Sequence, residues 1–280
     1  MSKYLFFFKD SKPFVKLLML ICIFMVCTSF VSYLIFFIPM SQLMGQIISQ
    51  FIMFGASALI WGLVFEGSAY SFIELKRKGF VFYLLSSISL VLFVIPFIDG
   101  IGVFNDSWHF NGDEVFRSME NQAKLSMARL LSDKSFTGLL LNIFTLALLP
   151  AITEELFFRA AMQKTFVNLV KNQFLGIFLT SIIFSLAHFQ LFSFLPRVFL
   201  GLFLGYLYTY SKNLIIPIIF HFINNSIVVV AYFLFINKVI DIDFNQVGAI
   251  YNPILFTISI IVIGIFFYIG YKKQRKNVSL

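Results

Sequence analysis

Long runs of apolar residues, separated by short polar segments, make up most of this chain. A membrane-spanning helix needs about 20 mostly apolar residues, because the hydrocarbon core of a bilayer is about 30 Å thick. Measured against that length, the apolar stretches predict eight spanning helices, at residues 14–38, 44–65, 80–98, 136–162, 174–192, 197–211, 214–236 and 253–271. The first stretch is too long for a removed signal peptide and has no small-residue cleavage site behind it, so we expect it to stay in the mature protein.

A ninth predicted helix lies in the longest polar stretch, residues 99–135, between the third and fourth spans. Its apolar residues recur at helical spacing, at Phe116, Met119, Ala123, Met127 and Leu130. Asp113 and Glu114 suit the N-terminus of such a helix. The pattern indicates an amphipathic helix at the outer membrane interface. We interpret it as a packing element or plug in preference to a substrate lid.

The composition agrees with a polytopic membrane protein. Of the 280 residues, 60% are hydrophobic and 12% are charged, which leaves too few polar side chains to cover a water-soluble globule. The 40 phenylalanines lie in stretches that lack the alternation of outer-membrane strands, so the spans are expected to be helices and not a β-barrel. The expected fold class is all-α, with one transmembrane domain over residues 1–280 and a catalytic core at about 136–236.

Basic residues are distributed asymmetrically along the chain. They follow the second, fourth, sixth and eighth spans, at Lys76, Arg77, Lys78, Lys164, Lys171, Lys212, Lys272, Lys273, Arg275 and Lys276. The positive-inside rule therefore predicts that both termini are cytoplasmic. The net charge of +8 reflects this asymmetry and attraction to anionic lipid head groups. It gives no independent support to nucleic-acid binding.

Three polar patterns interrupt the apolar spans. They are Glu154-Glu155 with Arg159, Phe184 with His188, and His221 with Asn225. An ionisable group at bilayer depth costs a few kcal/mol or more, and such groups mark functional sites by default. The patterns therefore predict an active site or transport site within the membrane.

The spacing of these residues suggests how they share the chemistry. Glu155 and Arg159 stand four positions apart on a helix and can pair, whereas Glu154 points about 100° away. Glu154 is therefore available as a general base. His221 and Asn225 share one helix face, although Asn224 reaches that face too. A carboxylate, two imidazoles and an amide can deprotonate a water and stabilise an oxyanion, which suits amide hydrolysis.

Together, the three patterns resemble the CPBP family of intramembrane proteases, which includes the type II CAAX prenyl endopeptidases and bacterial lysostaphin-resistance-A-like and abortive-infection proteins. The resemblance covers roughly residues 145–232. It implies two residues that activate the water and two that stabilise the oxyanion, respectively Glu154 with His188 and His221 with Asn225. Glu155 and Arg159 would support the site.

The resemblance leaves two possibilities for metal. The family is described as a metalloprotease family, whereas its better-understood members resemble glutamate-dependent proteases without zinc. This chain has no His-Glu-x-x-His motif, so we expect no cofactor. If zinc were bound, its ligands would be Glu154, His188 and His221, which would have to meet at about 2 Å from one ion.

The resulting prediction is an intramembrane endopeptidase that cleaves peptide or membrane-protein substrates near the cytoplasmic membrane surface. The short, Phe-rich and loop-poor chain is typical of a bacterial inner (cytoplasmic) membrane protein, for which targets include leader peptides and bacteriocin-like peptides. Two alternatives stay open. One is a non-catalytic immunity or scaffold relative, and the other is a proton-coupled transporter, a class that usually shows internal repeats.

The site residues must lie at the same depth in the membrane if they are to act together. At 1.5 Å per residue, straight helices place His221 near the cytoplasmic end of its span, Glu154 near the middle and His188 deeper. Helix tilt or a kink at Pro150 is expected to bring them level. Arg197, which follows a proline at the start of a span, is expected to anchor that span end by snorkelling.

Overall fold

The structure is a computed structural model that describes residues 8–68, 70–242 and 246–278. Over these residues the chain is helical and forms no β-strand, as predicted. The elements, in chain order, are α1 (Pro13–Phe37), α2 (Gln42–Ser49), η2 (Gln50–Ala56), α3 (Ser57–Glu66), α4 (Phe80–Asp106), α5 (Asp113–Leu130), α6 (Phe136–Asn142), η3 (Ile143–Leu148), α7 (Leu149–Glu155), η4 (Leu156–Gln163), α8 (Lys164–Val170), α9 (Gln173–Leu186), η5 (Leu191–Ser193), α10 (Phe194–Ser211), α11 (Ile215–Ile236) and α12 (Pro253–Val278).

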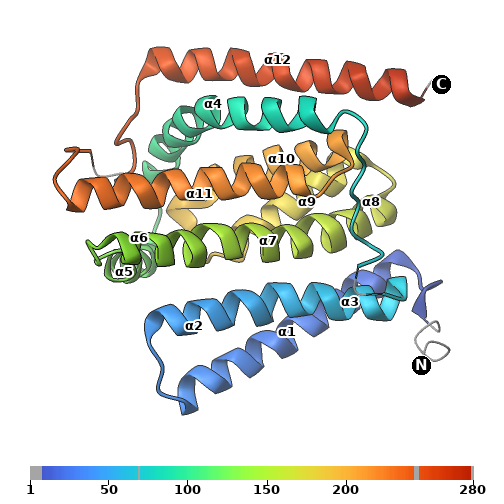
Figure 1. The fold of residues 1–280 in the computed structure, drawn as a ribbon, viewed down its shortest axis with the longest axis horizontal. Coiled ribbons are helices and arrows are strands. Elements are labelled where there is room, and N and C mark those ends of the chain that lie inside the picture. Colours follow the sequence, from blue (N-terminus) through green and yellow to red (C-terminus); the bar gives the residue numbers. More distant parts are fainter. Residues whose placement is uncertain (1–7, 69, 243–245, 279–280) are drawn as a thin grey trace.

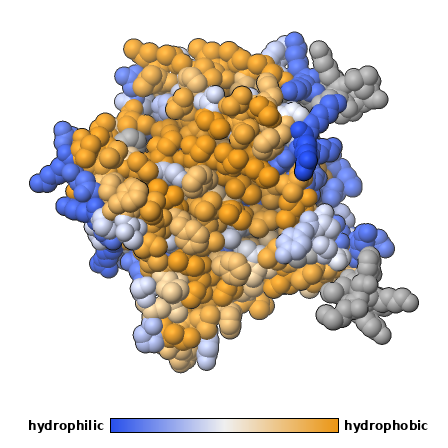
Figure 2. Space-filling model, in the orientation of Figure 1, coloured by the Kyte–Doolittle hydropathy of each residue, from blue (hydrophilic) through white to orange (hydrophobic). Residues whose placement is uncertain are grey.

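Each of the eight predicted spans corresponds to a helix, and the predicted interfacial helix is α5. Within the described ranges, seven helices are long and apolar enough to cross a membrane. In this count, the segments α2 to α3 form one continuous helix, and the segments α6 to α8 form another. The eighth, α9, is apolar but has 14 residues. Figure 2 shows an apolar surface between two hydrophilic ends. The protein is therefore an integral membrane protein.

The helices pass back and forth along a common direction (Figure 1). The start of α1 and the end of α12 lie at the same end of the bundle, which we call the terminal end. The opposite end, the far end, carries α5, which lies across the bundle beside α6. This arrangement places the connections after α4, α9 and α11 together at the far end.

Three π-helical segments interrupt the two long helices that approach the polar motifs. They are η2 in the helix from Gln42 to Glu66, and η3 and η4 in the helix from Phe136 to Val170. π-Helical turns are rare and occur often at functional sites. Pro150 lies in the first turn of α7, directly after η3, and the helix continues through it. A π-helical segment, η3, therefore lies directly before the position where the sequence predicted a proline kink.

Close packing between α9 and α10 positions the second motif. Gly201 lies against Ser181, and a Cβ atom at Gly205 would approach Ile177 within 2.6 Å. The Gln163 side chain donates a hydrogen bond of 3.1 Å to the Gly205 carbonyl and joins η4 to the same place. Gly201 and Gly205, four positions apart on α10, thus allow this close helix contact because they carry no side chain.

Candidate active site

The first and third motifs form one buried ion-pair cluster. Glu155 is fully buried, and its Oε2 accepts a hydrogen bond of 2.9 Å from Arg159 Nε. Its Oε1 lies 3.0 Å from Nδ1 of His221 on α11. The i,i+4 pair expected from the sequence is present, and it has a third member. Because breaking a buried ion pair leaves an uncompensated charge, these three residues depend on one another.

The hydrogen bonds of the two histidines define which ring nitrogen carries a proton. His221 Nδ1 faces the Glu155 carboxylate, and His188 Nδ1 lies 2.8 Å from the Phe184 carbonyl oxygen. Both partners are acceptors, so we assign the proton to Nδ1 in each ring. Nε2 of each neutral imidazole is then free to accept a proton or a hydrogen bond. This arrangement suits a base or a residue that orients water.

Phe184 connects the three motifs. Its buried ring lies 5.1 Å from the His188 ring and 6.1 Å from the His221 ring, between ring centroids. The Arg159 guanidinium lies 5.3 Å from the centroid of the same ring. Considered alone among 40 phenylalanines, Phe184 has the pattern of a core residue. Its contacts with both histidines and the buried arginine make it part of the site.

Glu154 is held by a residue that the sequence patterns did not single out. Its Oε1 accepts a hydrogen bond of 3.1 Å from Gln50 Nε2, at the start of η2. Oε2 is buried and has no hydrogen-bond partner among the described residues. Thr153 Oγ1 lies 3.3 Å from the side-chain oxygen Oε1 of Gln50 and 2.9 Å from the Leu149 carbonyl oxygen. One carboxylate oxygen of Glu154 is thus anchored and the other is free to react.

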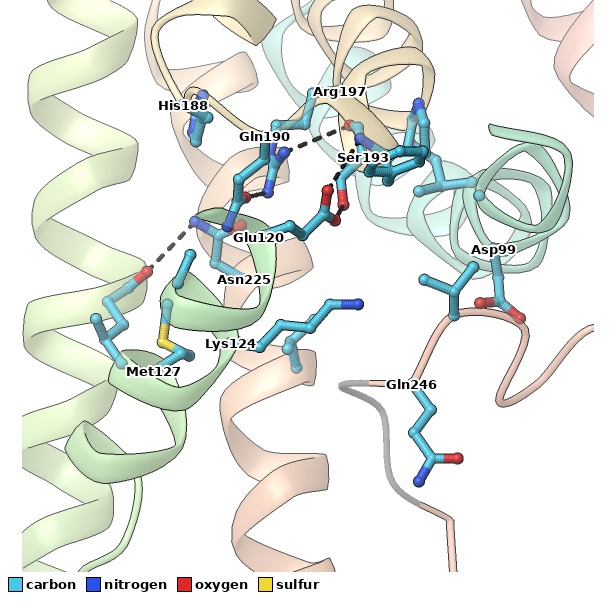
Figure 3. A pocket seen from close by; sticks show the side chains of 18 of the residues that line it. Asp99, Glu120, Lys124, Met127, His188, Gln190, Ser193, Arg197, Asn225 and Gln246 are labelled. Carbon is cyan, nitrogen blue, oxygen red and sulfur yellow. Dashed lines mark hydrogen bonds between the residues drawn. The ribbon is translucent and has the colours of Figure 1, made fainter. Parts of the chain in front are cut away.

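A cavity of about 420 Å³ opens beside these residues at the far end. His188 and Asn225 line it, together with charged residues from α4, α5 and α10 (Figure 3). Asn225 Nδ2 makes a long hydrogen bond of 3.4 Å to the Leu146 carbonyl oxygen. Glu154, Glu155 and His221 are not among the residues that line this cavity. The predicted site residues thus divide into two that face the cavity and a buried group behind them.

The predicted water-activating pair does not touch directly. Across the part of the chain that the structure describes, no hydrogen bond joins Glu154 to His188. Glu154 interacts electrostatically with His221 and Arg159, and His188 interacts with His221 and Arg197. The two groups therefore share His221 as a neighbour, and a bridging water would have to complete the contact between them.

His188 lies in a turn, which corrects its predicted place inside a span. α9 ends at Leu186, and the next residues form a tight turn in which Phe189 has a φ of +53°. Ser185 Oγ donates a hydrogen bond of 2.8 Å to the Phe194 carbonyl and ties this turn to α10. Because the turn includes no Gly or Pro, the sequence held no helix-breaking residue to mark this helix end. His188 consequently reaches the far-end cavity.

The cavity wall holds two further charged residues whose roles differ from those expected. Glu120 of α5 is 3% exposed and accepts hydrogen bonds from the Phe192 amide, at 2.9 Å, and from the Ser193 hydroxyl. Arg197 donates to the Gln190 side chain and lines the cavity, so the prediction that it snorkels to a span end is wrong. An arginine aimed into a polar cavity finds its hydrogen-bond partners inside the protein.

The face of α5 that points into the protein is not the apolar face that the sequence predicted. Phe116 and Met119 of the predicted apolar stripe are exposed, whereas Asp113 and Glu120 are the buried residues of this helix. Arg117 lies 3.8 Å from the centroid of the Phe192 ring. α5 therefore attaches to η5 mainly through polar and cation–π contacts, and its inner side faces the cavity.

The donor set for a metal is not assembled in this structure. Throughout the described part of the chain, no three His, Cys, Asp or Glu side chains lie close enough together to hold a metal ion. The alternative zinc ligands Glu154, His188 and His221 therefore do not converge on one point. The free Nε2 atoms of the histidines are of a type that zinc accepts, but a tetrahedral site needs further ligands at about 2 Å. The metal-free expectation stays a prediction.

Comparison with known proteins identifies the segment that carries the motifs. Residues 136–227 match the family model described as type II CAAX prenyl endopeptidase Rce1-like. The matched segment runs from the start of α6 into α11 and contains all three motifs. No curated protein and no solved structure matches the chain. This family consists of CAAX prenyl endopeptidases and implies an intramembrane protease. Residues 136–227, which carry all three motifs, are therefore similar to the Rce1-like family of type II CAAX prenyl endopeptidases.

Proposed function

We propose that this protein is an intramembrane endopeptidase in which Glu154 and His188 activate a water molecule for attack on a peptide bond. The observation that carries the proposal is the junction of the three motifs. One carboxylate of the first motif bonds to the histidine of the third, and the Phe184 ring contacts both histidines. These buried polar groups adjoin a cavity large enough for part of a peptide.

The proton transfers follow from the free atoms. Glu154 Oε2 accepts a proton from the water, while His188 Nε2 accepts a hydrogen bond from its other O–H. The water oxygen forms a bond to the scissile carbonyl carbon. When the C–N bond breaks, the proton held by Glu154 passes to the leaving amine. The products are a carboxyl group and an amine, and Glu154 returns to its starting state.

The oxyanion requires hydrogen-bond donors, so His221 and Asn225 must each have an N–H group that can point toward it. Asn225 Nδ2 makes only a long bond to the Leu146 carbonyl, so it can turn toward an oxyanion at low cost. His221 already donates Nδ1–H to Glu155, so its Nε2 donates only in the imidazolium form. The Glu155 carboxylate stabilises that cation. Glu155 therefore supports the site by holding the His221 ring in place through this hydrogen bond.

The position of the cavity revises the expected side of substrate entry. The cavity lies at the far end, opposite the start of α1 and the end of α12 (Figure 1). If the termini are cytoplasmic, as the basic residues predict, the substrate enters from the other side of the membrane. We therefore propose entry from the far end as the alternative to the predicted cleavage near the cytoplasmic surface.

A peptide-cleavage assay with paired histidine variants tests the proposal. The purified protein in liposomes should cleave members of a peptide library, and His188→Ala should abolish cleavage. His109→Ala is the matched control, because His109 is exposed on the loop before α5 and lies outside the site. Cleavage that persists in His188→Ala, or that disappears equally in His109→Ala, contradicts the assigned role.

A further inference from the structure

A second cavity, of about 340 Å³, lies at the terminal end and shares no lining residue with the active-site cavity. It is enclosed by the first turns of α1, the end of α3 and the whole of α8. Its lining includes Lys16, Trp61, Glu66, Phe72, Lys164 and Lys171. Three lysines and one glutamate therefore line a single cavity, and Lys171 is exposed.

The positive charge of this cavity is only partly balanced. Lys16 Nζ lies 3.4 Å from Glu66 Oε1. Lys164 Nζ lies 3.1 Å from Glu74 Oε1 and donates a hydrogen bond of 2.5 Å to the Phe72 carbonyl oxygen. Lys171 forms no ion pair with any residue in the described ranges. The cavity thus has at least one cation available for an anionic ligand.

The walls of the cavity hold the lysines in place. Trp61 Nε1 donates a hydrogen bond of 3.0 Å to the Lys16 carbonyl oxygen, which joins α3 to α1. Lys171 directly follows α8 and has a φ of +53°. This left-handed conformation is unfavourable for lysine and easy for glycine or asparagine. The backbone therefore fixes the direction in which the Lys171 side chain leaves the helix.

The surroundings of the cavity favour a ligand that has both an anionic head and apolar chains. On α1, Phe14, Val15 and Leu18 are exposed within one turn of Lys16. The predicted orientation places this end of the bundle at the cytoplasmic leaflet, where anionic lipids attract basic residues. Lysine ammonium groups bind phosphate as point charges with rotatable donors.

We propose that this cavity binds the phosphodiester head group of an anionic phospholipid, with the acyl chains along the exposed side of α1. The site is independent of the catalytic proposal, because it contains none of the catalytic residues. A bound lipid would connect α1 and α3 to α8, which continues directly from the helix that carries Glu154 and Arg159. The expected effect is therefore stabilisation of the bundle at its terminal end.

Lipid binding to the purified full chain tests the proposal. Native mass spectrometry should show phosphatidylglycerol retained over phosphatidylcholine, and thermal unfolding should occur at a higher temperature with phosphatidylglycerol. Lys171→Asn should weaken phosphatidylglycerol binding about fivefold, the effect of one interfacial lysine. Asparagine tolerates the left-handed backbone, so this variant should fold.

Lys238→Asn is the matched control. Lys238 has a φ of +60° and follows α11 at the far end, so the variant makes the same charge change in the same backbone conformation away from the cavity. It should bind phosphatidylglycerol as the parent protein does. If both lipids are retained equally, or if the two variants weaken phosphatidylglycerol binding equally, the proposal of a lipid site in this cavity is wrong. Equal stabilisation by inorganic phosphate alone overturns its assignment to a lipid.

Discussion

The Glu155 carboxylate lies 3.0 Å from Nδ1 of His221, although the two residues are 66 positions apart and belong to different helices. This contact makes a single unit of two motifs that look separate in the sequence. The other oxygen of the same carboxylate is held by Arg159. A change to any of the three therefore affects both the stability of the fold and the orientation of the His221 ring.

Arg159→Gln should destabilise the protein by about 3 to 5 kcal/mol, because it removes one partner of a buried ion pair. Thermal or denaturant unfolding in detergent measures the loss. Arg129→Gln is the control, since Arg129 lies on α5 and is exposed, and it should change stability by less than about 0.5 kcal/mol. If the two variants lose the same stability, the Glu155 cluster does not stabilise the fold in the way described.

Gln50→Leu should lower the rate of peptide cleavage about tenfold, since a hydrogen bond to a charged group is worth about 1.5 kcal/mol or more. The change removes the donor that orients Glu154. Gln46→Leu, one turn earlier on the same helix, makes the same substitution without touching that bond and should retain activity. Measuring kcat for both variants separates orientation of Glu154 from a general effect of a new leucine.

Glu120→Ala should release α5 from η5. The loss of a buried hydrogen-bond acceptor costs about 1 to 3 kcal/mol, so exchange of the Phe192 amide hydrogen should become about tenfold faster or more. Hydrogen exchange monitored by mass spectrometry over residues 190–194 measures this effect. Glu114→Ala, at the start of the same helix, should leave that exchange unchanged. Unaltered exchange in Glu120→Ala would show that Glu120 does not hold the helix in place.

Active protein should contain no stoichiometric zinc and should keep its activity after chelation. The physical reason is that Glu154, His188 and His221 do not form a common ligand set. Elemental analysis before and after treatment with a chelator measures both quantities. Zinc at one ion per chain, lost together with activity and restored with it, would refute the metal-free mechanism.

Hydropathy predicted the architecture well, because every spanning helix must reach the bilayer thickness with apolar residues. Helix ends were less predictable. The turn that holds His188 contains no Gly or Pro, so the predicted span ran six residues beyond Leu186, where α9 ends. The π-helical segments have no sequence signal either, although they lie next to Pro150 and Glu154.

The motif residues were recognisable from the sequence, whereas the residues around them depend on tertiary contacts. Gln50 lies in an apolar span and belongs to no motif. Only its hydrogen bond to Glu154 in the structure shows that it is part of the site. Glu120 lies on the polar side of an amphipathic pattern, which predicts exposure. It is buried because it accepts hydrogen bonds from the Phe192 amide and the Ser193 hydroxyl of η5, tertiary contacts that periodicity alone does not contain.

Single-turnover cleavage by Glu154→Gln protein in liposomes tests the central claim most directly. Glutamine keeps the size of the side chain and removes the base, so the variant should unfold at the parent temperature and show no cleavage. Glu114→Gln makes the same change outside the site and should cleave at the parent rate. Parent-level cleavage by folded Glu154→Gln protein would contradict the assignment of Glu154 as the group that activates water.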